Sequence, residues 1–195
     1  MPKLNAKDIL IPTVALVLIC GISTGLLAAT NEITKEPIAE VEAQSQENSI
    51  KLVSEKDAAR FVEIETGDDS VQCFEVYNSS DNLISYAVAT NAKGYGGTIK
   101  VMTGIEPDGN ILGVNVYDNS SETPGLGAKT SEIDFSFQFN EGSADTGYTV
   151  SKDADKNPGK MSVDAVTGAT ISSRAVVKAV NHAIDVFNQV SGGAE

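Results

Sequence analysis

Residues 164–173 of this chain read Asp-Ala-Val-Thr-Gly-Ala-Thr-Ile-Ser-Ser, a run of small and hydroxyl-bearing residues that leads into an amphipathic segment. After Ile171 the apolar residues recur at spacings of three and four, as on one face of an α-helix. These residues are Val176, Val180, Ala183, Ile184 and Phe187. Thr170 therefore stands where the chain is predicted to enter its last helix.

The start of a helix is a favourable place for a phosphate. Its first N–H groups have no partner within the helix, and the helix dipole places partial positive charge there. Gly168 and Ala169 would leave room near the backbone, and Ser172 and Ser173 would add hydroxyl donors. The same residues also fit a plain glycine turn with serine and threonine caps. The local pattern alone leaves both interpretations open.

The whole string resembles the flavinylation motif D-x-x-(S/T)-G-A-T-x-(S/T) of the FMN-binding domains in the RnfG and NqrC family. Members of that family are subunits of Rnf complexes and of Na⁺-translocating NADH:quinone oxidoreductases. Residues 94–97, Gly-Tyr-Gly-Gly, resemble a family segment that precedes a strand. Residues 122–127, Glu-Thr-Pro-Gly-Leu-Gly, resemble a family loop. The resemblance covers residues 94–187 and implies an FMN-binding domain.

The resemblance also implies how FMN is held. The last threonine of the motif, here Thr170, would carry FMN covalently through a phosphoester that a separate flavin transferase makes. Glu122 and Thr123 would make polar contacts with the isoalloxazine ring, and Leu126 would give it an apolar face. The other cofactor-binding residues implied are Thr167, Gly168, Ala169, Asp164, Val163, Gly127 and Lys152. Asp164 belongs to the motif that the transferase reads.

Composition limits the classes of function. The formal net charge of −13 disfavours binding to nucleic acid or, through basic residues, to anionic lipid. Cys20 and Cys73 are far apart, and no C-x-x-C or zinc-binding pattern is present. With one histidine as well, the chain is not expected to hold haem c or a Cys₄ iron–sulfur cluster by itself. Any electrons that it handles would need an organic cofactor.

The N-terminal region predicts a membrane anchor. Residues 9–30 contain no charged side chain, and as a helix they would span about 33 Å, enough for the apolar core of a bilayer. Lys3 and Lys7 precede this run and glutamates follow it, which predicts a cytoplasmic N-terminus and an extracytoplasmic domain. The expected parts are an anchor at 1–30, a linker at 31–48 and the FMN-binding domain at 49–195. A cleavable signal peptide is the alternative, since Ala28 and Ala29 are small.

The remaining pattern predicts an α+β fold with a mainly antiparallel sheet flanked by helices. Residues 51–65 have apolar side chains at roughly helical spacing and predict a short helix that starts at Ser54. Strands are expected from residue 71 onward and at 83–88, 98–105 and 111–117. Residues 107–110, Pro-Asp-Gly-Asn, predict the hairpin turn between the last two.

The acidic segment at residues 153–164 allows a second interpretation. Asp153, Asp155 and Asn157 fall at positions 1, 3 and 5 of a calcium-loop pattern, with Asp164 at position 12. Pro158 stands where the pattern requires glycine, so a solvated acidic loop is the simpler expectation. His182 is expected to be an ordinary surface or boundary residue.

The function that these features favour is an electron-transfer subunit of a membrane-bound, ion-translocating ferredoxin:NAD⁺ oxidoreductase of the Rnf type. Such a subunit would not act as an enzyme alone, and it would pass electrons between partner centres while the complex moves Na⁺ or H⁺. Its partners would be the other Rnf subunits, including a membrane flavin subunit, together with the flavin transferase. The alternatives are an Nqr-type subunit and a membrane-anchored extracellular binding module on the same scaffold without a redox role. The acidic domain and the short chain favour the Rnf type.

Overall fold

The computed structural model describes residues 6–54, 57–68, 70–140 and 142–192. Its first element, α1 (Ala6–Val53), contains a stretch that is long and apolar enough to cross a membrane, and none of that stretch is buried within the protein. The chain divides between Gln44 and Ser45 into two compact units. Lys3, one basis for the predicted orientation, lies outside the described residues.

The segment at 31–48, predicted as a linker, is helical throughout and forms part of α1. Its glutamate, glutamine and serine residues and its one proline suggested a linker, but glutamate and glutamine are also good helix formers. Pro37 lies inside the helix and removes one backbone hydrogen bond there without ending it. The polar composition of residues 31–48 therefore did not indicate that they are helical, because a helix exposed to solvent does not need an apolar face.

The prediction of a helix at residues 51–65 was wrong. α1 ends at Val53, residues 55–56 lie outside the described part of the chain, and Ala58–Ile64 form strand β1. β1 is an edge strand that pairs antiparallel with β2, with a register shift between Ala58 and Arg60. Most of its side chains are at least partly exposed on both faces, so the sequence lacks the clean alternation of a strand.

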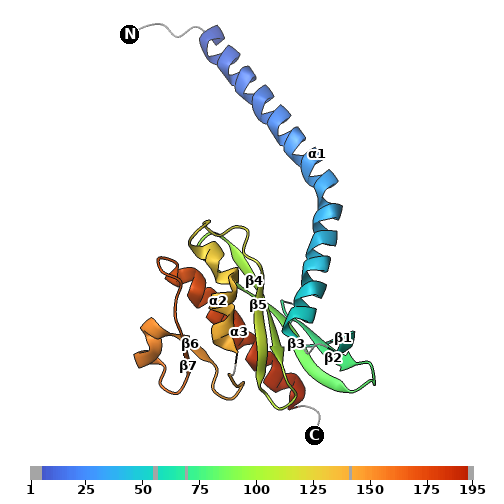
Figure 1. The fold of residues 1–195 in the computed structure, drawn as a ribbon. Helices are drawn as coiled ribbons and strands as arrows, with labels where there is room; N and C mark the ends of the chain where they lie inside the picture. The colour runs from blue at the N-terminus through green and yellow to red at the C-terminus, as the bar shows by residue number, and fades with distance from the viewer. Residues whose placement is uncertain (1–5, 55–56, 69, 141, 193–195) are drawn as a thin grey trace. The chain divides into compact units, whose positions relative to one another are not determined.

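The four strands predicted after residue 70 are present, although β3 runs beyond its predicted end at residue 88, and with β1 they form a five-stranded antiparallel meander in the order β1-β2-β3-β4-β5. Two further short strands, at 148–150 and 161–163, were not predicted. The turn before β5 closes with Gly109 at φ +89°, a conformation that suits glycine. The α+β fold class is thereby confirmed, and Figure 1 shows the sheet at the centre of the domain. The bounds are β2 (Gln72–Asn78), β3 (Leu83–Lys93), β4 (Thr98–Ile105) and β5 (Ile111–Asp118).

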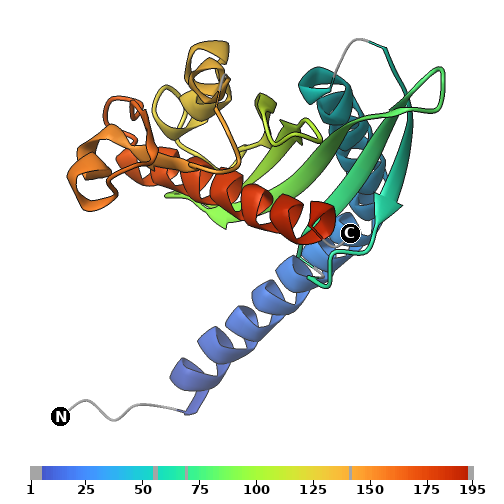
Figure 2. The same cartoon turned by 90° about the horizontal axis from the view of Figure 1, so that it is seen from below.

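Both faces of the central strands are buried. One face packs against α3 (Thr170–Ser191), the predicted C-terminal helix, which lies along the sheet in Figure 2. Thr90 of β3 donates a buried hydrogen bond to the carbonyl of Ala179 in α3, at 2.9 Å. The other face is covered by the last turns of α1, where Ile50 and Val53 contact Met102 and its neighbours. α3 is thus fixed firmly on the sheet, and its N-terminus is fixed with it.

Short elements connect the sheet to α3. After β5 come η1 (Gly127–Ser131), α2 (Ile133–Ser136) and η2 (Phe137–Phe139). β6 (Tyr148–Val150) and β7 (Met161–Val163) then form a small parallel pair joined by η3 (Ser151–Lys156). These segments hold the loops that surround the N-terminus of α3.

The burial of Cys73 gives a test of the sheet. Cys73 lies fully buried in β2, and desolvation, assisted by the nearby Glu75, raises the pKa of its thiol to about 12. In a Cys20→Ser background, we expect Cys73 to resist a maleimide at pH 8 until the protein is denatured, because the thiol is both inaccessible and protonated. Adding Ser120→Cys, in an exposed loop, should restore rapid labelling of the folded protein. Rapid labelling of Cys73 in the folded chain would contradict the placement of β2.

Candidate functional site

A cavity of about 420 Å³ lies at the N-terminus of α3. Four separate segments line it: the turn between β3 and β4, the loop after β5, η3, and the loop that enters α3. The lining residues are Tyr95, Glu122, Thr123, Leu126, Gly127, Lys152, Gly168, Ala169, Thr170, Ile171 and Ser172. All three strings singled out in the sequence therefore meet at one place.

The loop before α3 is held by its own backbone and by Ser173. Gly168 adopts φ +79°, and the Ala169 N–H donates to the Val166 carbonyl at 2.9 Å. The Ser173 hydroxyl accepts from the Val166 N–H and donates to the Ala169 carbonyl, both at 3.0 Å. Ser173 is fully buried, so the expectation that it offers a hydroxyl to a phosphate was wrong. It stabilises the turn instead.

The N-terminus of α3 is open to an anion. Ala169 occupies the N-cap position, and in the described part of the chain no side chain makes a capping hydrogen bond there. The first-turn N–H groups thus lack the partner that a serine or aspartate cap would supply. Lys152 of η3 donates from its ammonium group to the Thr170 hydroxyl at 3.2 Å. A hydroxyl, a cation and a helix N-terminus therefore converge at Thr170.

Glu122 connects the three strings. Its side chain is only 4% exposed. One carboxylate oxygen accepts the Gly96 N–H at 3.0 Å, and the other accepts the Ser172 hydroxyl at 2.7 Å. A buried carboxylate needs such donors, because desolvation without them would be costly. Ser172 thus serves Glu122, and the expectation that it adds a donor for a phosphate was wrong as well.

The glycines around Glu122 are explained by close packing. A Cβ atom on Gly94 or Gly127 would overlap the Glu122 carboxylate, and one on Gly96 would overlap the Ser121 carbonyl. The Gly-Tyr-Gly-Gly string and the Glu-Thr-Pro-Gly-Leu-Gly string therefore pack directly against each other. Sequence reasoning treated them as separate motifs because they lie far apart along the chain.

Two further side chains support these loops, and no sequence pattern pointed to that role. The Asn119 amide donates to the Ala128 carbonyl at 2.9 Å and to the Thr130 hydroxyl at 3.2 Å. The Gln138 amide accepts the Asp164 N–H at 2.7 Å and donates to the Asp164 carbonyl at 3.3 Å. These contacts join the β5 loop, η2 and the entry to α3.

Eight of the eleven residues predicted for the site line the cavity, and three do not. Val163 is fully buried in the core with β7, so its side chain does not reach the cavity. Asp164 and Thr167 are exposed and line a neighbouring shallow pocket together with Lys129 and Glu132. Two residues of the motif are therefore exposed outside the cavity that contains Thr170.

The cavity walls are partly apolar. Tyr95, Leu126 and Ile171 are 72%, 43% and 52% exposed. Large apolar side chains gathered at the mouth of a cavity are typical of a ligand site. The arrangement is suited to a flat apolar group with an anionic end at Thr170.

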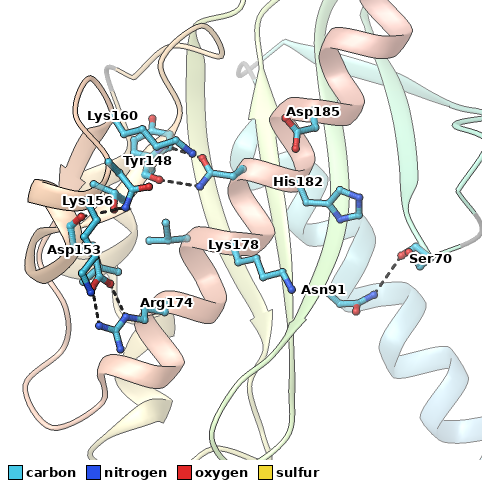
Figure 3. Close-up of a pocket in the computed structure, with 15 residues that line it drawn as sticks. Ser70, Asn91, Tyr148, Asp153, Lys156, Lys160, Arg174, Lys178, His182 and Asp185 are labelled. Atoms are coloured by element: carbon cyan, nitrogen blue, oxygen red, sulfur yellow. Dashed lines mark hydrogen bonds and ion pairs between the residues drawn. The ribbon is translucent and has the colours of Figure 1, made fainter.

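A second groove, of about 670 Å³, runs between α3 and the β6–η3 segment (Figure 3). Its labelled cations are Lys156, Lys160, Arg174 and Lys178. The guanidinium of Arg174 donates two hydrogen bonds to Asp153, at 2.6 and 2.9 Å, and they lower the pKa of the Asp153 carboxyl. His182 lies 3.5 Å from Asp68.

The calcium-loop interpretation is not supported by the arrangement of these side chains. The Asp153 carboxylate is engaged by Arg174, and the Asn157 amide donates to Thr149 and to the Asp153 carbonyl. Among the described residues no group of three or more His, Cys, Asp or Glu side chains is placed to hold a metal ion.

Comparison with known sequences gives two matching families. The FMN-binding domain family matches residues 94–185, and the RnfG N-terminal region matches residues 1–53. The G subunit of the proton-translocating ferredoxin:NAD⁺ oxidoreductase complex of Clostridium ljungdahlii is 33% identical, covering 91% of each chain. The G subunit of the Na⁺-translocating complex of Acetobacterium woodii is 33% identical over 90% of each. The corresponding G subunit of the ion-translocating oxidoreductase complex of Methanosarcina acetivorans is 35% identical, over 96% of this chain and 99% of the relative.

Comparison with solved structures supports the fold. The C subunit of the Na⁺-translocating NADH-quinone reductase of Parabacteroides distasonis superposes with a TM-score of 0.56 and 17% identity, over 71% of this chain and 79% of that one. NqrC of Shewanella oneidensis gives a TM-score of 0.50 and 24% identity, over 73% of both chains.

Packing at Gly127 gives a test of the cavity. We expect Gly127→Ala to destabilise the protein by about 1–3 kcal/mol, because the new methyl group displaces the Glu122 carboxylate from its hydrogen bonds. Gly113→Ala is the matched control, since a Cβ at Gly113 in β5 would make only ordinary contacts, the nearest at 3.8 Å. Thermal unfolding of the full-length protein in detergent measures both. Equal stability of the two variants would contradict the packing described.

Proposed function

The chain belongs to the RnfG family of FMN-binding subunits of ion-translocating ferredoxin:NAD⁺ oxidoreductases, and we propose that it carries FMN bound covalently to the Thr170 hydroxyl by a phosphoester. The observation that carries this proposal is the convergence of Lys152 and the uncapped start of α3 on Thr170. An anionic phosphate at this position would be stabilised by both.

The residues of the cavity fit FMN. Gly168 and Ala169 place only small residues beside Thr170, and Gly127 lets the Glu122 carboxylate pack at the cavity lining. Leu126, with Ile171 and Tyr95, would cover the apolar faces of the isoalloxazine ring, and the exposed Thr123 would offer a polar contact at its edge. FMN supplies the redox chemistry when bound, and the chain supplies position and electrostatics.

Attachment needs an activated flavin donor. A bond would form between Thr170 Oγ and the phosphorus of the FMN moiety, while the bond from that phosphorus to its leaving group breaks. With a flavin dinucleotide as donor the leaving group is AMP, the hydroxyl proton passes to a base, and no oxidation state changes. The transferase would supply that base. Asp164 and Thr167, which are exposed outside the cavity, would be accessible to the transferase.

A covalent bond has a clear advantage outside the cytoplasm. A noncovalent flavin with a Kd near nanomolar would be held by about −12 kcal/mol and would still dissociate slowly. Replacement FMN is scarce outside the cell membrane, so each loss would inactivate a subunit. The ester removes this route of loss.

Glu122 is proposed to tune the cofactor. Its two oxygens are held by Gly96 and Ser172, so the position of its negative charge beside the cavity is fixed. A fixed carboxylate opposes the arrival of further negative charge on a neighbouring group. This role adds to the structural one described above.

As a subunit, the chain is proposed to pass electrons between redox centres of its partners, among them a membrane flavin subunit, while the complex moves Na⁺ or H⁺. Among the residues that the structure describes, one helix, α1, is long and apolar enough to span a membrane. A single helix cannot form an ion path, so ion movement would belong to other Rnf subunits. The N-terminus is proposed to be cytoplasmic, with the FMN domain on the outer side of the cell membrane.

Substitution of the acceptor residue tests the attachment. We expect Thr170→Ala to abolish the flavin that survives denaturation, since the ester needs the hydroxyl, and to lower stability little. Thr170→Ser should retain some flavin, and Thr146→Ala, at an exposed threonine away from the cavity, should retain all of it. In-gel flavin fluorescence after denaturation is the measurement. Full fluorescence in Thr170→Ala would show that the flavin is attached elsewhere or not by this ester.

Cysteine labelling tests the orientation. In a Cys20→Ser background, where Cys73 is buried, we expect Glu40→Cys to react with a membrane-impermeant maleimide added to intact cells. Lys7→Cys should react only after the membrane is opened. The reverse pattern would place the domain in the cytoplasm.

A further inference from the structure

The η3 segment, which carries Lys152, is not held in place by apolar burial. None of its six residues, all within the described chain, is buried. It projects between β6 and β7 and lies beside the first turns of α3. Polar contacts therefore position Lys152 relative to Thr170. Asn157 holds the end of η3 through Thr149 and the Asp153 carbonyl, and the remaining contacts join η3 to α3.

Two such contacts stand next to each other. Lys152 and Asp153 are consecutive residues of η3, while Thr170 and Arg174 lie one turn apart on the same face of α3. Lys152 donates to Thr170, and Asp153 accepts both hydrogen bonds of the Arg174 fork, as Figure 3 shows for that pair. A bidentate pair fixes direction as well as distance, which a single lysine contact cannot do.

The pair also determines which cation is available at Thr170. Asp153 engages the guanidinium of Arg174 on the side of the second groove. Lys152 makes no ion pair with a carboxylate in the part of the chain that the structure describes, and its contact is the Thr170 hydroxyl. One cation is thus directed at Thr170, and the neighbouring one is neutralised.

We propose that Asp153 and Arg174 are a positioning pair that holds η3 against α3, keeps the Lys152 ammonium at the Thr170 hydroxyl, and so sets the rate at which flavin is attached. This inference rests on the proposed function, in which Thr170 is the acceptor. Asp153 and Arg174 act through Lys152 and are not among the residues that line the cavity.

The test is a double-mutant cycle on the full-length chain, with purified transferase and flavin dinucleotide. The variants are Asp153→Asn, Arg174→Gln and the two combined, and the rate of flavin incorporation is followed by in-gel fluorescence and intact mass. We expect each single variant to slow attachment by about tenfold, as misplacement of a reacting group does. The combined variant should be no slower than the worse single one, because the same contact is lost in each.

Two further readouts separate positioning from general damage. The turnover rate of the transferase should fall while its KM for the chain stays the same, since Asp164 and Thr167 remain available for docking. The Tm should change by about 2 °C or less, because Arg174 is half exposed and solvent screens the ion pair. The control is the Arg60–Asp81 ion pair at the β1 edge of the sheet, whose side chains are 51% and 76% exposed, against 49% and 19% for Arg174 and Asp153. Arg60→Gln and Asp81→Asn should leave the rate unchanged.

The outcomes distinguish this inference from the proposed function. If the wild-type chain takes up no flavin at Thr170, the proposed function fails. If the wild-type chain is flavinylated and the Asp153 and Arg174 variants match its rate, the positioning pair is refuted. Additive losses in the combined variant, a rise in KM at unchanged turnover, or an equal loss in the Arg60 and Asp81 controls would also refute it.

Discussion

The burial of one carboxylate constrains the whole ligand-facing end of this domain. Glu122 is removed from water, so it must be given donors, and these come from Gly96 in one loop and Ser172 in the last helix. Backbone can approach the carboxylate closely only where side chains are absent, which accounts for Gly94 and Gly127. The packing that satisfies this buried carboxylate therefore also forms part of the cavity lining.

Much of the architecture was predictable from the sequence because it follows from local rules. The strands from β2 to β5 alternate or are continuously apolar, the Pro-Asp-Gly-Asn turn joins the last two, and α3 has a regular apolar face. The predictions that failed concern the region before β2. An edge strand exposed on both faces and a polar helix in solvent both lack an apolar period, so β1 and residues 31–48 could not be recognised by pattern.

The candidate site, like the fold, has features that the sequence predicted and features that it did not. The segments that line the cavity were found through family resemblance, which marks positions but does not reveal what each side chain contacts. Ser172 and Ser173 were expected to face a ligand and instead hold Glu122 and the entry turn. Asn119, Gln138 and the Asp153–Arg174 pair support the site through contacts between residues that are distant in sequence or unremarkable in type. Only the folded chain brings them together.

The position of Thr170 has a consequence for how a carrier of this kind works. Thr170 is the first residue of a 22-residue helix, and eleven residues of that helix, all between Ser172 and Phe187, are buried. A group esterified there is mounted on the end of a rigid rod, unlike a lipoyl or biotinyl arm, which swings on a flexible tether. A group attached at this rigid position can move little by itself. The distance from that group to an electron donor or acceptor can therefore shorten only if the whole domain moves or the partner moves, and such motions are slower.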